Sequence, residues 1–498
     1  MRQTARDRDA AEEMRSRRRS KADDMVYDEQ KRGNRQIFII TYFFVALFLG
    51  MMVYITVFMV RDSADIINNS YNKRQEVLAK KVKRGKILSA DGKVLVKTIT
   101  DKKGNDKRYY PYNNMFCHVI GRITNSMTGV ELSQCYPLLT SHANPLEQLM
   151  DNFKGKKKPG DNVVTTVNYK LQKTAYDALG SYRGAVVAME PSTGKILAMV
   201  SKPDYNPNTV GKDWNKLISG GDGNSALLNR ATQGIYPPGS TFKILTAAEY
   251  IIENGSKYKN YKYVCKGTDE FYGNKISCYG GEVHGKVNLN RAFSESCNGA
   301  FANIGLKLNT GSFKSLCEKF GFNRELSVNF EYKKSSFVLN GKSDKGEIMQ
   351  TAIGQGKTGI TPLENVLISS TIANKGKMMV PYVIDHTESD SGKQVKKYSP
   401  KSAGKIIDKS VAVSVKNLMK SVVKDGTASS LNRFSYRVAG KTGSAEFDSK
   451  GTSHAWFVGF APADNPKIAV SIVVESAGTG SRYAVPIAEK MFREYIGD

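Results

Sequence analysis

The stretch YPPGSTFKILTAAEYIIENG, residues 236–255, combines a sharp turn signal with a long apolar pattern. Its Pro-Pro-Gly favours a turn, and the apolar periodicity behind it predicts a helix that ends at the glycine. Ser240 therefore lies at or near the N-terminus of this helix, and Lys243 follows three residues later. Side chains three residues apart share one face of a helix, so the two are predicted to lie within reach of each other.

A serine beside a lysine at this position is a candidate nucleophile with its own base. A serine hydroxyl attacks poorly until a base removes its proton, and a desolvated lysine can be neutral enough to act as that base. The partial positive charge at a helix N-terminus also favours developing anions. The same S-x-x-K spacing occurs without the Pro-Pro-Gly and the apolar helix at Ser256/Lys259, Ser402/Lys405 and Ser421/Lys424. The context therefore selects Ser240.

A second short motif places a hydroxyl and a carboxamide one residue apart, at Ser296 and Asn298. The hydroxyl could relay a proton, and the carboxamide could hold a substrate amide. The same spacing recurs near the apolar N-terminal segment at Ser70/Asn72 and again at Ser430/Asn432.

The third motif is Lys-Thr-Gly at 441–443, followed by Ser444, on a strand-like run. Lys441 could offer a positive charge to a carboxylate, and the glycine lets a substrate backbone approach closely. A second Lys-Thr-Gly at 357–359 is predicted to be a loop that opens a helix, and it is set aside.

The three motifs in this order match the set found in penicillin-binding proteins and serine β-lactamases. The chain resembles class B penicillin-binding proteins over nearly everything after its apolar segment. The blocks that carry the resemblance are RGKILSADGKVL (84–95), HVIGR (118–122), GAVVAMEPSTGKILAMVSKPDYNPN (184–208), TAIGQG (351–356), TPLEN (361–365) and HAWFVGFAP (454–462).

The resemblance implies a role for each motif residue. Ser240 would be the acylated nucleophile, Lys243 its general base, and Ser296 and Asn298 the proton relay and substrate clamp. Lys441 would be a further catalytic residue, and it would bind the terminal carboxylate of the substrate together with Thr442, Gly443 and Ser444. The backbone N–H groups of Ser240 and Ser444 would form the oxyanion hole.

The implied activity is peptidoglycan D,D-transpeptidation. Stem peptides ending in D-Ala-D-Ala would acylate the serine, β-lactams would do so irreversibly, and the acyl group would pass to an amine of a neighbouring strand. The region up to about Lys158 is too short for a glycosyltransferase domain, so the resemblance implies a SEDS-type polymerase as partner. A D,D-carboxypeptidase or β-lactamase, which would admit water instead, and an inactive scaffold or sensor remain alternatives.

The pattern of elements predicts an α+β fold. GAVVAME and KILAMVS read as strands joined by a PSTG turn, and three strand-like runs near the C-terminus precede a final helix. We expect these strands to form one antiparallel sheet flanked by helices, as in serine β-lactamases. Alternating residues on either side of Asp91-Gly92 predict a hairpin that begins a small β-rich pedestal domain.

An uncharged apolar run at 37–60 is long enough to cross a bilayer as a helix. The preceding tail, residues 1–36, carries 11 Lys+Arg against 8 Asp+Glu, and cations beside the span favour a cytoplasmic N-terminus. We therefore expect a single-pass protein of the cell membrane with its catalytic domain outside. The predicted parts are the tail 1–36, the span 37–60, a stalk and pedestal at 61–158, and a transpeptidase domain at 159–498.

The net charge of +27 lies mostly beyond the tail and suits an anionic surface such as cell wall, and no nucleic-acid motif accompanies it. A P-loop is excluded because the GKT runs at Gly356 and Gly440 lack the upstream glycine. Cys265 and Cys278 could close a short loop as a disulfide or remain thiols. No cysteine or histidine spacing is typical of a metal site, so neither a metal nor a cofactor is expected.

Overall fold

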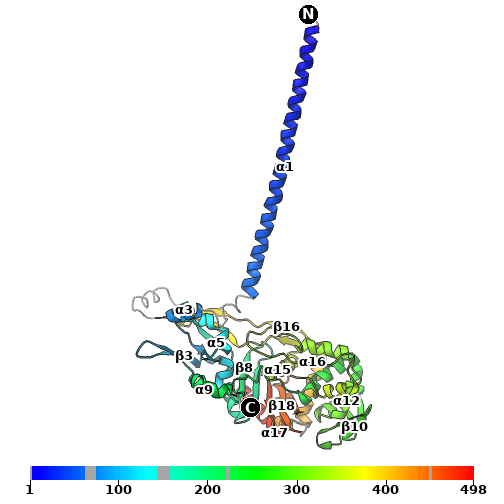
Figure 1. Ribbon diagram of the computed structural model, residues 1–498. Helices are drawn as coiled ribbons and strands as arrows, with labels where there is room; N and C mark the ends of the chain where they lie inside the picture. Colours follow the sequence, from blue (N-terminus) through cyan, green and yellow to red (C-terminus); the bar gives the residue numbers. More distant parts are fainter. Residues whose placement is uncertain (1–2, 62–73, 143–156, 220–224, 448–450) are drawn as a thin grey trace. The chain divides into compact units, whose positions relative to one another are not determined.

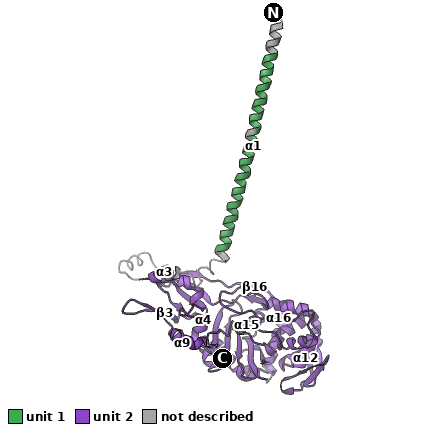
Figure 2. Ribbon diagram, viewed as in Figure 1, with its two compact units in different colours: residues 1–72 green, residues 73–498 purple. Residues whose placement is uncertain are grey.

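The computed structural model describes residues 3–61, 74–142, 157–219, 225–447 and 451–498. The chain forms two compact units, residues 1–72 and residues 73–498 (Figure 2). Each is described by itself.

The described part of the first unit is one long helix, α1 (Gln3–Arg61), which contains residues 3–36 of the predicted tail and the predicted span. The segment Asn34–Phe58 is the one described helical stretch long and apolar enough to cross a membrane. Its side chains are exposed, as Phe38 at 61% and Tyr54 at 70% illustrate. Apolar side chains with no protein core to cover them are suited to lipid, which agrees with a single N-terminal anchor.

A five-stranded antiparallel sheet lies at the centre of the second unit, in the order β17-β18-β19-β7-β8 (Figure 1). Its strands are β7 (Gly184–Met189), β8 (Ile196–Lys202), β17 (Ala439–Glu446), β18 (Ser453–Ala461) and β19 (Ile468–Val474). The C-terminal strand β19 pairs with β7, with Val470 opposite Ala188. The predicted α+β class is confirmed. The expected single antiparallel sheet is also confirmed, since the three late strands β17, β18 and β19 join the hairpin formed by β7 and β8.

The longer helices of the second unit are α8 (Tyr169–Leu179), α9 (Val210–Ile218), α10 (Lys243–Asn254), α12 (Asn298–Gly305), α13 (Thr310–Phe320), α14 (Lys345–Ala352), α15 (Pro362–Ala373), α16 (Lys409–Asp425) and α18 (Val485–Ile496). Among them α8, α15, α16 and α18 pack on this sheet. Every residue of α15 is buried, against β7, β18 and β19. Its start follows from the sequence, because Thr361 caps the N–H of Glu364 and a proline occupies the first turn.

The β-rich region builds a second, six-stranded sheet in the order β15-β14-β6-β2-β3-β4. Its strands are β2 (Ile87–Leu88), β3 (Val94–Thr100), β4 (Asp106–Tyr109), β6 (Asn162–Thr165), β14 (Ile384–Glu388) and β15 (Gln394–Lys397). Gly92, with φ of 77°, turns β2 into β3, as the Asp-Gly signal predicts. Three of the six strands come from beyond Lys158, so the sheet draws on both sides of the predicted boundary.

The boundary at 158/159 therefore stays a prediction, and residues 62–73 and 143–156 of the predicted stalk and pedestal lie outside the described residues. The shorter elements are α3 (Arg74–Lys81), α4 (Cys117–Ile120), α5 (Gly129–Ser133), α6 (Cys135–Leu138), α11 (Leu289–Ser294), α17 (Gly480–Tyr483), η1 (Asn113–Phe116), η3 (Gly239–Phe242), η4 (Gly255–Asn260), η5 (Tyr279–Gly281), η6 (Ser429–Arg433), β1 (Val82–Lys83), β5 (Lys158–Pro159), β9 (Lys262–Cys265), β10 (Thr268–Phe271), β11 (Asn274–Ser277), β12 (Gly285–Asn288), β13 (Lys377–Met379) and β16 (Ser402–Lys405).

A buried ionic cluster, which the sequence did not reveal, ties the β-rich region together. The fully buried carboxylate of Glu131 accepts hydrogen bonds from Arg84 Nε at 2.8 Å and Arg108 Nε at 2.6 Å. Burial alone would raise the pKa of Glu131, but the two guanidinium groups outweigh it and hold that pKa below its usual value.

We predict that Glu131→Gln lowers the free energy of unfolding of the full-length protein by about 3–5 kcal/mol, because both guanidinium groups lose their buried counter-charge. Since the folded-state pKa of Glu131 is depressed, its stabilising effect is present above the unfolded-state pKa. That effect is lost as the pH falls through the folded-state value. Urea titrations near neutral pH and in acid measure both effects.

Asp177→Asn is the matched control, because it breaks the exposed Lys173–Asp177 pair. Equal urea midpoints for Glu131→Gln and Asp177→Asn would contradict the stabilising role of the buried Glu131 carboxylate.

Candidate active site

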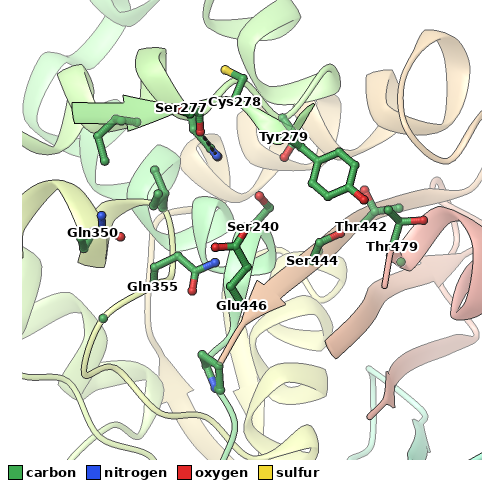
Figure 3. Close-up of a pocket in the computed structure, with 18 of the residues that line it drawn as sticks. Ser240, Ser277, Cys278, Tyr279, Gln350, Gln355, Thr442, Ser444, Glu446 and Thr479 are labelled. Carbon is green, nitrogen blue, oxygen red and sulfur yellow. Dashed lines mark hydrogen bonds between the residues drawn. The ribbon is translucent and has the colours of Figure 1, made fainter. Parts of the chain in front are cut away.

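A cleft of about 1040 Å³ lies beside the start of α10. Residues from all three motifs line it: Ser240, Ser296, Asn298, Thr442, Gly443 and Ser444. Figure 3 shows Ser240, Thr442 and Ser444 among the lining residues. Lys243 and Lys441 are fully buried and contact the lining residues directly. The tertiary structure therefore brings together every residue that the sequence predicts for the site.

The chain reaches Ser240 through the short 3-10 turn η3, which leads directly into α10. Gly239 has φ of 53°, and a Cβ atom there would lie 2.9 Å from the carbonyl oxygen of Ser444, so only glycine fits. Trp456 Nε1 donates to the carbonyl oxygen of Pro237 at 3.1 Å and fixes the preceding turn to β18. These contacts hold the Ser240 side chain at the cleft (Figure 3).

Lys243 directs its ammonium group toward the second motif. Its Nζ donates to Ser296 O at 2.7 Å, to Ser296 Oγ at 3.3 Å and to Asn298 Oδ1 at 2.7 Å. These bonds use all three N–H donors of a protonated lysine, and none of its bonds among the described residues goes to Ser240. Burial lowers the pKa of Lys243 to about 8. In its neutral form the Lys243 amine has a lone pair, which can accept the proton of a nearby hydroxyl.

Lys441 approaches the same hydroxyl from strand β17. Its Nζ donates to Ser296 Oγ at 2.9 Å and to Thr442 O at 3.1 Å. Burial, together with the charge of Lys243, holds the pKa of Lys441 well below its usual value. Two aromatic rings partly compensate the buried cations, since Lys243 lies 5.4 Å from the Phe301 centroid and Lys441 lies 5.7 Å from that of Phe293.

The backbone of the second motif is strained where it meets the two lysines. Ser296 has φ of 60°, a conformation that costs about 1–3 kcal/mol for a residue with a side chain. It lies between α11 and α12, and Asn298 Nδ2 donates to Ser277 O at 2.9 Å. Such strain persists only where surrounding contacts fix the chain, which makes this turn a positioned element of the site.

The third motif lies on β17, at the edge of the five-stranded sheet. Among the described residues, β17 pairs with β18 alone, with Thr442 opposite Phe457 and Ser444 opposite Ala455. An edge strand presents unpaired N–H and C=O groups to which an extended peptide can add. The Thr442 hydroxyl is held by a 2.5 Å hydrogen bond with that of Thr427.

The second Lys-Thr-Gly, residues 357–359, lines the same cleft, although it was set aside from the sequence. Tyr279, Gln355 and Glu446, which no sequence motif indicated, line it as well (Figure 3). Lys357 is largely exposed and pairs with Glu347 at 3.5 Å. Only the unexplained repetition of Lys-Thr-Gly in the sequence could have pointed to this wall.

The sulfurs of Cys265 and Cys278 lie 3.6 Å apart. A disulfide requires about 2.05 Å, so both residues are thiols here, as are the chain's other four cysteines. The disulfide suggested as one alternative is not formed in this structure.

Comparison with known proteins agrees with this geometry. Residues 184–496 match the family model described as the penicillin binding protein transpeptidase domain. The chain is 33% identical over 432 residues to the peptidoglycan D,D-transpeptidase PbpA of Mycolicibacterium smegmatis, covering 81% of this chain and 87% of that protein.

Solved structures agree in fold. A ceftriaxone acyl-enzyme complex of penicillin-binding protein A from M. tuberculosis has a TM-score of 0.76 at 30% identity, covering 84% of this chain and all of that one. The D,D-transpeptidase domain of a peptidoglycan glycosyltransferase from Eggerthella lenta has a TM-score of 0.75 at 28% identity, covering 83% and 98%.

The matched region contains all three motifs, the cleft between them and the whole five-stranded sheet. The resemblance inferred from the sequence is therefore correct, and the chain belongs to the penicillin-binding protein transpeptidase family.

Proposed function

We propose that the protein is a peptidoglycan D,D-transpeptidase that uses Ser240 as its acylated nucleophile. Ser240 Oγ would attack the carbonyl between the two terminal D-alanines, the last D-alanine would leave, and an amine of a neighbouring strand would take the acyl group. The observation that carries this proposal is the convergence of Lys243 and Lys441 on Ser296 beside Ser240.

Proton transfer would involve Lys243 and Ser296, which are already joined by a hydrogen bond. Lys243, when neutral, would accept the proton of Ser240, and Ser296 would pass a proton to the departing amine. Because two ammonium groups would lie close together at one hydroxyl, the lysine pair favours the state in which only one of the two amines is protonated. A substrate carboxylate near Lys441 would draw that proton to Lys441 and leave Lys243 neutral.

Substrate binding would use the edge of the sheet. The terminal carboxylate would meet Lys441, Thr442 and Ser444, while Gly443 gives the peptide room to lie along β17. The backbone N–H groups of Ser240 and Ser444 would stabilise the oxyanion, and losing one such donor typically costs about 3–4 kcal/mol of transition-state stabilisation. Asn298, fixed by Ser277, would hold the substrate amide.

The wider setting of the proposal rests on the anchor and the charge. The cations before the apolar segment favour a cytoplasmic N-terminus, and the catalytic unit would then lie outside the cell, at the anionic cell wall. A SEDS-type polymerase remains the partner that we propose, since a transpeptidase needs strands made by another enzyme.

We predict that Ser240→Ala abolishes the covalent penicillin adduct of the full-length protein in detergent. Intact-protein mass spectrometry and peptide mapping of YPPGSTFK measure it. The control is Ser256→Ala, which removes the serine of an exposed S-x-x-K and should acylate normally. Substantial adduct on Ser240→Ala would refute the assignment.

The second-order rate constant for penicillin acylation is predicted to rise with pH and to level off above about pH 8. The fraction of neutral Lys243 grows as the pH passes its lowered pKa, and well below it the rate should fall about tenfold per pH unit. Lys243→Arg, which cannot lose its proton, should acylate very slowly at every pH. A flat profile from pH 6 to 9 would exclude Lys243 as the base.

Partitioning of the acyl-enzyme separates transpeptidation from the hydrolytic alternatives. With a D-Ala-D-Ala donor and a D-amino acid acceptor, we expect mostly the exchanged product, measured by mass spectrometry. Mainly hydrolysed donor would indicate a carboxypeptidase, rapid penicillin hydrolysis a β-lactamase, and no reaction an inactive scaffold.

A further inference from the structure

Four soft ligand side chains converge beside the active site. Cys265 ends β9, Cys278 follows β11, His284 precedes β12, and Cys297 caps α12. All four are buried, with exposures of 1%, 4%, 7% and 0%. None of them has a role in the proposed acyl transfer.

Three of the six separations between the ligand atoms are close to the edges of a tetrahedron around one ion. Cys265 Sγ and Cys278 Sγ are 3.6 Å apart, Cys278 Sγ and Cys297 Sγ 3.9 Å, and Cys265 Sγ and His284 Nδ1 3.4 Å. All four atoms lie within 4.8 Å of one another. Tetrahedral zinc, with Zn–S of about 2.3 Å and Zn–N of about 2.0–2.1 Å, sets two sulfurs about 3.8 Å apart and a sulfur and a nitrogen about 3.5 Å apart.

The surroundings also suit bound thiolates. The backbone N–H of Gly267 donates to Cys265 Sγ, and that of Ala300 donates to Cys297 Sγ, both at 3.4 Å. Among the described residues His284 Nε2 is buried without a hydrogen-bond partner, and the Glu282 carboxylate lies 3.9 Å from it. A metal-bound histidine commonly directs its second nitrogen to such a carboxylate.

We propose that Cys265, Cys278, His284 and Cys297 form a closed structural Zn²⁺ site. Three cysteines with one histidine in tetrahedral positions are a standard zinc donor set, and four protein ligands leave no open position for a reacting water. A Cys265–Cys278 disulfide explains the cluster less well, because it would leave Cys297 and His284 with no shared partner.

The site would fix the second catalytic motif in place. Cys297 lies between Ser296 and Asn298, so a metal bond to it holds the strained turn from within. Cys278 adjoins Ser277, whose carbonyl oxygen accepts from Asn298. The ion would therefore bond the end of β11 to the start of α12, and Cys297 and its partners are positioning residues for Ser296.

The first test is metal content. Full-length protein carrying no histidine tag, purified in detergent without chelator, should contain about one zinc per chain by inductively coupled plasma mass spectrometry. Replacement by Co²⁺ should give the intense visible bands of a tetrahedral thiolate site. A chain with no stoichiometric metal, or non-reducing peptide maps showing a Cys265–Cys278 disulfide, would overturn the proposal.

Variants test the ligands and the positioning role. Cys265→Ala and His284→Ala should lose the zinc, whereas His284→Cys should keep it because four thiolates also bind zinc tetrahedrally. Cys317→Ala, which removes another buried cysteine, is the matched control and should keep full metal content.

The rate of penicillin acylation should rank the His284 variants in the same order as their zinc content. A misplacement of 1 Å can cost about 10²-fold in rate, so we expect penicillin acylation of His284→Ala to slow roughly 10- to 100-fold and His284→Cys to restore it. Metal content that is equal in His284→Ala and wild type would contradict the proposed ligand set. Slow acylation in His284→Cys despite full zinc would contradict the positioning role.

Discussion

The ammonium groups of Lys243 and Lys441 meet at the hydroxyl of Ser296, at 3.3 and 2.9 Å, inside a protein core. Two buried like charges are unfavourable unless hydrogen bonds and polarisable groups compensate them. The surrounding fold supplies carbonyl oxygens, a carboxamide and two phenylalanine rings. Burial lowers the pKa of both lysines, and the charge of Lys243 lowers that of Lys441 further, which is what lets a lysine act as a base. The burial that makes the two lysines unfavourable in the fold is therefore also what prepares one of them to act as a base.

Each partner in that contact is held by a different element. Lys243 belongs to α10, Lys441 to the edge strand β17, and Ser296 to the turn before α12. The sheet places β17 beside the Pro-Pro-Gly turn through the Trp456 to Pro237 hydrogen bond. The turn at Ser296 is the least regular of the three, with φ of 60° in a residue that has a side chain. It is also the one that the proposed zinc site would stabilise.

The β-rich region and the N-terminal helix supply none of the proposed catalytic residues. The Glu131 cluster fixes the β-rich region by an internal ionic bond, and its six-stranded sheet includes strands β14 and β15 from the later part of the chain. The two regions of residues 73–498 are thus joined by strand pairing and not merely by a linker. The charge beyond the tail suits an enzyme that works against an anionic polymer.

Local sequence determined what depends on near neighbours. The Pro-Pro-Gly, the three-residue spacing of Ser240 and Lys243, the Asp-Gly hairpin and the uncharged segment at 37–60 each follow from contacts within a few residues, and the three motifs together identified the family. Tertiary structure decided what depends on distant contacts. Glu131 finds its arginines 47 and 23 residues away, and the second Lys-Thr-Gly lies at the cleft where Gly359 pairs with Ser336. The four metal-type ligands come from separate strands and a helix cap, with no C-x-x-C pair among them. Such groups become neighbours only when the chain has folded, because close spacing in the sequence is not what brings them together.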